Sequence, residues 1–187
     1  MEQFEVIKRI TLALQRTLAA DLEDALGRAV PVLFAYDAAR KPGQEQMTLV
    51  QVGLQRRQGN VDREYEAQGE GEQFRNPPLL LRAHYLLSAW ATPPEDQVLI
   101  GAALRAFLDQ PELALEGDDE EVVAYAGTPS VDLDTLTAEE HRALASALGM
   151  PFAPSVGYWV DFRLRSGKVT PIKRVRERVM DFRKIEG

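Results

Sequence analysis

The sequence predicts an α+β fold, in which a mostly antiparallel sheet packs with a long N-terminal helix and two further helices. Three observations lead to this class. Residues 4–25 repeat apolar side chains at helical spacing, several later segments alternate as strands do, and two Thr-x-x-Glu patterns mark helix starts. The chain has 187 residues, of which 45% are hydrophobic and 27% charged, and these values are typical of one globular domain.

The N-terminal helix is predicted from apolar side chains that recur every three or four residues. They are Phe4, Ile7, Ile10, Leu14, Leu18, Leu22 and Ala25. Gly27 lies just past the last of them and is expected to cap the C-terminus of the helix. The apolar residues 30–36 then predict a strand, and Lys41-Pro42-Gly43 predicts the turn that ends it.

A second strand is predicted at residues 47–56, where side chains alternate between two faces. The face formed by Thr48, Val50, Val52 and Leu54 is clearly the more apolar of the two. Residues 58–78 are rich in Gln, Glu, Gly and Arg, which favours a long surface loop with a short strand near Tyr65.

Residues 79–90 form the strongest apolar run, and periodicity alone does not decide between strand and helix there. The preceding Pro77-Pro78 favours an extended conformation, so we expect a strand. Thr92-Pro93-Pro94-Glu95 predicts the start of a helix, with Thr92 as N-cap and Glu95 completing a capping box. That helix should stop before Pro111.

The last part of the chain predicts shorter elements. We expect an acidic turn at 116–121, a strand at 122–125, a helix from a capping box at Thr137 to Gly149, and a strand at 156–164. Arg165-Ser166-Gly167-Lys168 suits a hairpin turn, and residues 169–182 fit either a strand or a basic helix. We therefore divide the chain into an α+β domain, 1–165, and a basic C-terminal strand or arm, 166–187.

The residue types argue against catalysis. The chain has no Cys, which excludes disulfides, thiolate zinc sites, Fe–S clusters and cysteine nucleophiles. Ser88 and His84 could join an Asp in a hydrolytic triad, but His84 lies within an apolar run, where a hydrogen-bonded structural role is commoner. His141 has neighbouring glutamates but no second ligand cluster, and residues 118–121 lack the spacing of an EF-hand loop. We expect no enzyme activity, no catalytic residue, no metal and no cofactor.

Charge is distributed unevenly along the chain. The net charge is −7, yet residues 163–187 hold nine basic and three acidic side chains, which leaves 13 basic and 26 acidic ones in 1–162. We expect the basic segment to bind protein, including a neighbouring copy of this acidic chain. The interface residues would be Lys168, Lys173, Arg174, Arg176, Arg178, Arg183 and Lys184. The alternative is a small nucleic-acid-binding or regulatory domain, in which these side chains contact phosphates.

No targeting segment is recognisable. The N-terminal sequence Met1-Glu2-Gln3-Phe4-Glu5 is acidic, unlike a signal peptide, and no stretch approaches the roughly 18 apolar residues of a membrane span. We therefore expect the protein to stay in the cytoplasm when it is made, without direct membrane contact.

Three separated motifs, taken together, resemble one protein family. They are the apolar run 81–90 after Arg75-Asn76-Pro77-Pro78, the helical segment 95–113 with its late Pro111, and Pro151-Phe152-Ala153-Pro154-Ser155-Val156-Gly157-Tyr158. In this order they resemble the cap, or tail-terminator, proteins of extracellular contractile injection systems. These phage-tail-like particles include antifeeding prophages and Photorhabdus virulence cassettes.

The resemblance implies a structural protein with a tail-terminator-like fold. Such caps form a ring, usually of six subunits, that ends the inner tube and anchors the distal end of the sheath. Its partners would be further copies of the chain, inner-tube subunits and sheath subunits, and not nucleic acid. The basic segment could supply charge complementary to a neighbour, or add a strand to a neighbouring sheet. Deleting residues 168–187 should then abolish ring formation or sheath attachment and leave a folded domain.

Overall fold

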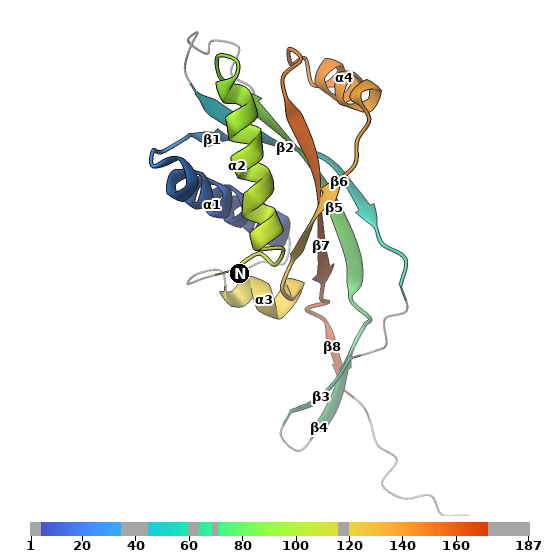
Figure 1. Ribbon diagram of the computed structural model, residues 1–187. Coiled ribbons are helices and arrows are strands. Elements are labelled where there is room, and N and C mark those ends of the chain that lie inside the picture. Colours follow the sequence, from blue (N-terminus) through green and yellow to red (C-terminus); the bar gives the residue numbers. More distant parts are fainter. Residues whose placement is uncertain (1–4, 35–44, 60–63, 69–70, 116–119, 172–187) are drawn as a thin grey trace, which may run out of the picture.

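A computed structural model describes residues 5–34, 45–59, 64–68, 71–115 and 120–171 (Figure 1). These residues form four helices, a five-stranded sheet and a three-stranded sheet. In chain order the elements are α1 (Val6–Leu26), β1 (Val32–Leu33), β2 (Gln46–Arg56), β3 (Glu64–Gln68), β4 (Gly71–Arg75), β5 (Leu79–Trp90), α2 (Glu95–Asp109), α3 (Glu120–Ala126), β6 (Ser130–Asp134), α4 (Ala138–Ala147), β7 (Ser155–Leu164) and β8 (Val169–Pro171). The predicted α+β class is confirmed.

The long helix α1 follows the predicted apolar pattern. Ile10, Leu14, Leu18 and Leu22 are buried on one face, whereas Ala25 is exposed. Gly27 ends the helix as expected, because its φ of 66° is readily adopted by glycine and its N–H donates to Glu23 O at 2.8 Å.

The larger sheet has the strand order β1-β2-β5-β7-β6, and all of its pairs except β1–β2 are antiparallel. The strands expected at 47–56, 79–90 and 156–164 are confirmed as β2, β5 and β7. The strand expected at 30–36 is reduced to β1, which pairs with β2 over two residues. Residues 35–44, with the predicted Lys41-Pro42-Gly43 turn, lie outside the described residues.

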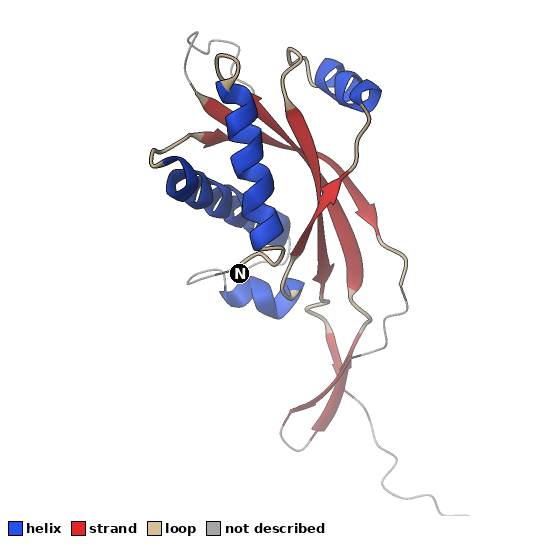
Figure 2. Cartoon of the chain, in the orientation of Figure 1, coloured by secondary structure: helices blue, strands red, loops and turns tan. Residues whose placement is uncertain are grey.

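The two faces of this sheet have different environments, as Figure 2 shows. Helices α1, α2 and α3 lie on one side, where the Tyr85 hydroxyl meets Thr11 Oγ1 at 2.8 Å and Tyr158 Oη donates to Ala103 O at 3.2 Å. Helix α4 lies near one end of the opposite face. Met150 and Ala153, which follow α4, pack there with Trp90 and Val50 in a small apolar cluster.

The core-facing side of β2 differs from the sequence pattern. Met47 and Leu49 are buried in the main core, although the alternate set of residues is the more apolar. Val50 packs on the small cluster of the opposite face, and Leu54 is 46% exposed. A bulge between Gln51 and Gly53 shifts the register and exchanges the two faces within the strand. The face that alternation marks as the more apolar is therefore not the one that packs on the main core.

A second, three-stranded sheet extends the molecule beyond the ends of β5 and β7 (Figure 1). The strand expected near Tyr65 is confirmed as β3, but residues 58–78 are not a long loop, because β4 also forms there and pairs with β3. The expected hairpin at Arg165-Ser166-Gly167-Lys168 is wrong as well. After these residues the chain does not return along β7; instead β8 pairs with β4.

The strand expected at 122–125 is also wrong, because these residues lie in helix α3. Val122 and Ala126, one helical turn apart, are both buried in the core, and the helix contacts α1 and β7. Helical packing therefore overrides the β-branched Val122-Val123 pair. The strand in this region is β6. The described residues thus form three helices besides α1, where two were expected.

The two expected capping boxes have different outcomes. At Thr137 the box forms, since Glu140 N donates to Thr137 Oγ1 at 3.3 Å and Thr137 N donates to Glu140 Oε2 at 2.8 Å. At Thr92 it does not, because α2 has Pro94 as its N-cap with no side-chain cap bond. Thr92 contributes only its carbonyl, which accepts from Glu95 N at 2.9 Å.

Candidate functional site

The basic segment predicted as a protein interface is described only in part. Lys168 is exposed, and its N–H donates to Ser166 Oγ at 3.2 Å just before β8. The remaining six predicted residues lie outside the described residues: Lys173, Arg174, Arg176, Arg178, Arg183 and Lys184. The interface role of all seven therefore stays a prediction.

A row of polar side chains crosses the sheet face that faces away from α1 and α2. We call this row the polar strip; it consists of Arg57, Arg82, His84, Asp132, Asp134, Trp159 and Asp161. Strand register brings its members together, because Arg82 lies opposite Asp161, and His84 lies opposite Trp159. Side chains at alternate positions share a face, so this row is the reverse side of the apolar core positions.

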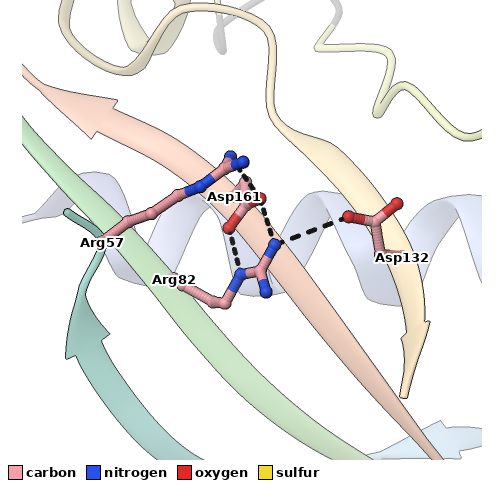
Figure 3. Close-up of polar contacts among 4 residues, drawn as sticks. All are labelled: Arg57, Arg82, Asp132 and Asp161. Carbon is pink, nitrogen blue, oxygen red and sulfur yellow. Dashed lines mark hydrogen bonds and ion pairs between the residues drawn. The ribbon is translucent and has the colours of Figure 1, made fainter. Parts of the chain in front are cut away.

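Asp161 is the centre of the polar strip (Figure 3). Arg82 donates to its two carboxylate oxygens, from Nε at 2.6 Å and from Nη2 at 2.6 Å, while Arg57 Nη1 donates to Oδ2 at 2.7 Å. Asp132 Oδ2 lies 3.7 Å from Arg82 Nη2. The hydrogen bonds from Arg82 hold the pKa of Asp161 below its usual value, and the same contacts raise the pKa of Arg82.

His84 extends the polar strip along β5. Its ring stacks on Trp159 with the centroids 4.1 Å apart, and its Nε2 lies 2.9 Å from Asp134 Oδ2. Burial lowers the pKa of His84, and the neighbouring Asp134 partly offsets this effect. The imidazole is thus packed against Trp159, with the Asp134 carboxylate beside its Nε2.

The catalytic alternative built on Ser88 finds no geometric support. Ser88 is buried and receives a hydrogen bond from Ser155 Oγ at 2.8 Å. His84 lies four residues away along an extended strand, a separation of about 13 Å at roughly 3.3 Å per residue. Its partner is Asp134 and not Ser88. No nucleophile–base pair of the kind found in hydrolases is formed by these two side chains.

The β6 edge is a second surface feature. Val131 donates its N–H away from β7, to Pro111 O at 2.7 Å. Since strand residues alternate, Leu133 also directs its N–H and C=O away from β7, and neither group has a backbone partner among the described residues. The side chain of Leu133 is 53% exposed.

A groove of about 320 Å³ lies beside this edge, on the helix side of the sheet. Its lining is mainly apolar and comes from α2, the Pro111 segment, β6 and β7: Leu104, Phe107, Leu108, Pro111, Val131, Asp132, Leu133 and Tyr158. Leu108 is 80% exposed. The edge therefore combines open main-chain hydrogen-bonding groups with an apolar flank.

Neither a cluster of metal-ligating side chains nor a long apolar helix occurs in the part of the chain that the structure describes. No three acidic or histidine side chains within it come together as a metal site. His141, the one candidate ligand on α4, is half-buried. None of the described helices combines the length and the apolar character that a bilayer span requires.

Sequence reasoning missed the polar strip. The signal that could have revealed it is that the polar residues of two otherwise apolar strands occupy alternate positions, and therefore one face of each strand. Arg82 and His84 share one face of β5, and Trp159 and Asp161 share one face of β7. Pairing the two strands would have placed an arginine beside an aspartate on one surface, but the register is not contained in either segment alone.

The comparisons with known proteins agree with this architecture. The family model described as the Pvc16 N-terminal domain matches residues 9–175. This chain belongs to the Pvc16 N-terminal domain family. The family resemblance predicted from the three sequence motifs is thereby confirmed. No curated protein matches the chain.

Two solved structures share the fold of this chain, and both are tube terminators. One is a PVC sheath/tube terminator in the extended state, with a TM-score of 0.64, 12% identity, and coverage of 94% of this chain. The other is the anti-feeding prophage tube-terminating cap, with a TM-score of 0.64, 13% identity, and coverage of 92% of this chain. The match spans 65% and 60% of the lengths of those two proteins, respectively.

Proposed function

We propose that this protein is a structural terminator subunit of a phage-tail-like contractile injection particle. In this role its copies form a ring on the last layer of the inner tube, stop further tube growth and hold the distal end of the sheath. The observation that carries the proposal is the family match over residues 9–175, in a fold shared with two tube terminators over at least 92% of the chain. The role is mechanical and needs no reaction or cofactor.

The surface of the protein suits a ring of identical subunits. Such a ring requires two different, complementary patches on each copy, so that each subunit binds the next one head to tail. The β6 edge with its groove is one candidate patch. The basic arm, proposed as residues 166–187, is a second, opposite in charge to the acidic domain 1–165 that we propose as the body. We propose a hexamer with inner-tube and sheath subunits as its partners, assembled in the cytoplasm into a particle that is released or anchored.

The test is to purify the full chain with and without inner-tube subunits of its own particle. We expect rings, or tubes closed by a ring at one end, in electron micrographs, with a subunit number given by native mass spectrometry. Tube length should become limited when this protein is present and unlimited when it is absent. A strictly monomeric protein that never binds a tube end would contradict the proposal.

A truncation separates the arm from the fold. Because β8 pairs with β4 in the second sheet, the truncation should remove residues 172–187 and keep Pro171. We expect the truncated protein to keep the circular dichroism spectrum and the cooperative unfolding of the full chain, but to lose ring formation or sheath attachment. The matched control replaces residues 172–187 by a Gly/Ser segment of equal length.

A further inference from the structure

We propose that residues 173–179 of a second copy add a strand to the open edge of β6, as the contact that joins neighbouring subunits. The proposal rests on the ring proposed above and names its interface. Main-chain groups of Leu133 would bind the added strand. The added arginines would lie over the acidic side of β6, and the added valines would enter the groove beside Leu108.

The state of the β6 edge argues for a covering strand. Exposed sheet edges are usually shortened, charged or covered, because they pair with other chains. The opposite edge of the same sheet is formed by β1, which is only two residues long. At β6, by contrast, the N–H and C=O of Leu133 have no backbone partner in the described part of the chain, and its side chain is 53% exposed, beside Leu108 at 80%. This is the pattern of an edge that is covered in the assembled state.

The two faces of β6 differ in a way that selects the added strand. Asp132 and Asp134 lie on the face of the polar strip, and Asp132 is 62% exposed at its side chain, with Arg82 only 3.7 Å from it. Val131 and Leu133 lie on the other face, which borders the apolar groove. A strand that fits here must carry cations on one face and apolar side chains on the other.

Residues 173–179 have this alternation. In an extended conformation Arg174, Arg176 and Arg178 share one face, while Val175 and Val179 share the other with Lys173 and Glu177. Residues 172–187 carry six basic and three acidic side chains, whereas residues 1–171 carry 16 basic and 26 acidic ones. The segment thus offers three arginines to the acidic face of β6 and two valines to the groove, with Lys173 and Glu177 beside the valines.

The place where the described chain ends favours a second copy as the donor. Strand β8 belongs to the small sheet, which extends away from the β6 region beyond the end of β7 (Figure 1). The described chain therefore ends, at Pro171, in the small sheet and away from β6. The segment that follows β8 can therefore reach the β6 edge of a neighbouring copy. When each copy in a ring binds the next one in this way, the contacts form a closed ring.

Disulfide trapping tests the pairing directly, because the natural chain has no Cys. Leu133→Cys is combined in the full chain with Val175→Cys, or with Val179→Cys, and the protein is oxidised under assembly conditions. The matched control combines Leu54→Cys, an exposed β2 position, with the same second cysteine. We expect a ladder of covalent oligomers on non-reducing gels, at least tenfold more abundant for Leu133→Cys than for Leu54→Cys.

The outcomes separate this inference from the proposed terminator role. Equal trapping by the control, or an intramolecular disulfide in monomers, overturns the inference. Rings on tube ends without trapping also overturn it, and leave the terminator role standing. A trapped ladder without any tube-end ring supports the strand pairing and contradicts the terminator role. Monomers with neither rings nor trapping contradict both.

A backbone substitution supplies an independent readout. Leu133→Pro removes the outward N–H of the β6 edge, where proline is tolerated because that group bonds to nothing within the sheet. Leu133→Thr keeps the N–H while changing the side chain. We expect at least a tenfold loss of oligomer for Leu133→Pro at unchanged melting temperature, and a smaller loss for Leu133→Thr. Equal losses for the two variants overturn main-chain pairing.

Discussion

At the scale of single residues, the polar strip shows how two strands carry a charge cluster on the face of the sheet opposite the main core. Asp161 is 9% exposed and accepts three short hydrogen bonds from Arg82 and Arg57. A buried carboxylate needs such partners because desolvation disfavours its charge. The cluster therefore acts as a polar clamp between β5, β7 and the segment after β2.

Asp161→Asn should destabilise the fold by about 1–3 kcal/mol, because it leaves Arg82 without its charged acceptor. The pKa of Asp161 is held below its ordinary value of 3.8, so its contribution is complete above that pH and is lost as the pH falls toward the lowered pKa. Urea unfolding between pH 2 and 7 should show a larger loss of stability at acid pH in the natural protein than in the variant, because other carboxylates titrate in both. Asp132→Asn, at an exposed position, should change stability by less than about 0.5 kcal/mol.

His84 offers a second titration test. Burial lowers its pKa below the ordinary 6.5, so the unfolded chain holds the proton more tightly and stability falls as the pH drops below about 6.5. Asp134 opposes this effect, and Asp134→Asn should therefore lower the pKa of His84 further. NMR titration of the His84 imidazole resonances measures its pKa in the natural protein and in the variant. A rise of the His84 pKa in Asp134→Asn would refute the role assigned to Asp134.

At the scale of elements, the long apolar patterns were predictable and the short ones were not. The bounds of β5 match the predicted run because all twelve of its residues belong to one continuous, mainly apolar segment. Residues 122–125 are too few for their pattern to distinguish a strand from a helix, and packing against α1 and β7 favours the helix. The core side of β2 was hidden by its bulge, and the polar strip by the register between strands. Each miss reflects information that comes from tertiary contact.

The packing of α1 makes a quantitative prediction for the core. Leu18 is completely buried, so Leu18→Ala should lower the free energy of unfolding by about 2–5 kcal/mol through lost burial and the cavity left behind. Leu108→Ala removes the same atoms from α2 at a side chain that is 80% exposed, and should change stability by less than about 0.5 kcal/mol. Thermal and urea unfolding of the two variants measure the contrast. Similar losses in both would mean that Leu108 is covered in the isolated protein.

At the scale of the whole molecule, assembly should depend on salt. In the proposed ring the acidic body and the basic arm attract each other between copies, and such an attraction is screened over about 8 Å at physiological ionic strength. Raising NaCl from 50 to 500 mM should therefore weaken subunit association in sedimentation experiments. The triple variant Arg174→Gln, Arg176→Gln, Arg178→Gln should associate more weakly and respond less to salt. A salt response unchanged by these substitutions would contradict an electrostatic role for the arm.

The continuity of the two sheets has a mechanical consequence. Strand β4 leads into β5 and β7 leads into β8, so two neighbouring strands run through both sheets. Ladder hydrogen bonds lie across the strands, and a pull on the small sheet along the strand axis draws β5 and β7 together, so the flanking ladders of β2 with β5 and of β6 with β7 are loaded in shear. We expect a higher rupture force in optical-tweezers experiments for this direction than for peeling β6 from β7. The protein would thus resist a load best along the axis of β5 and β7.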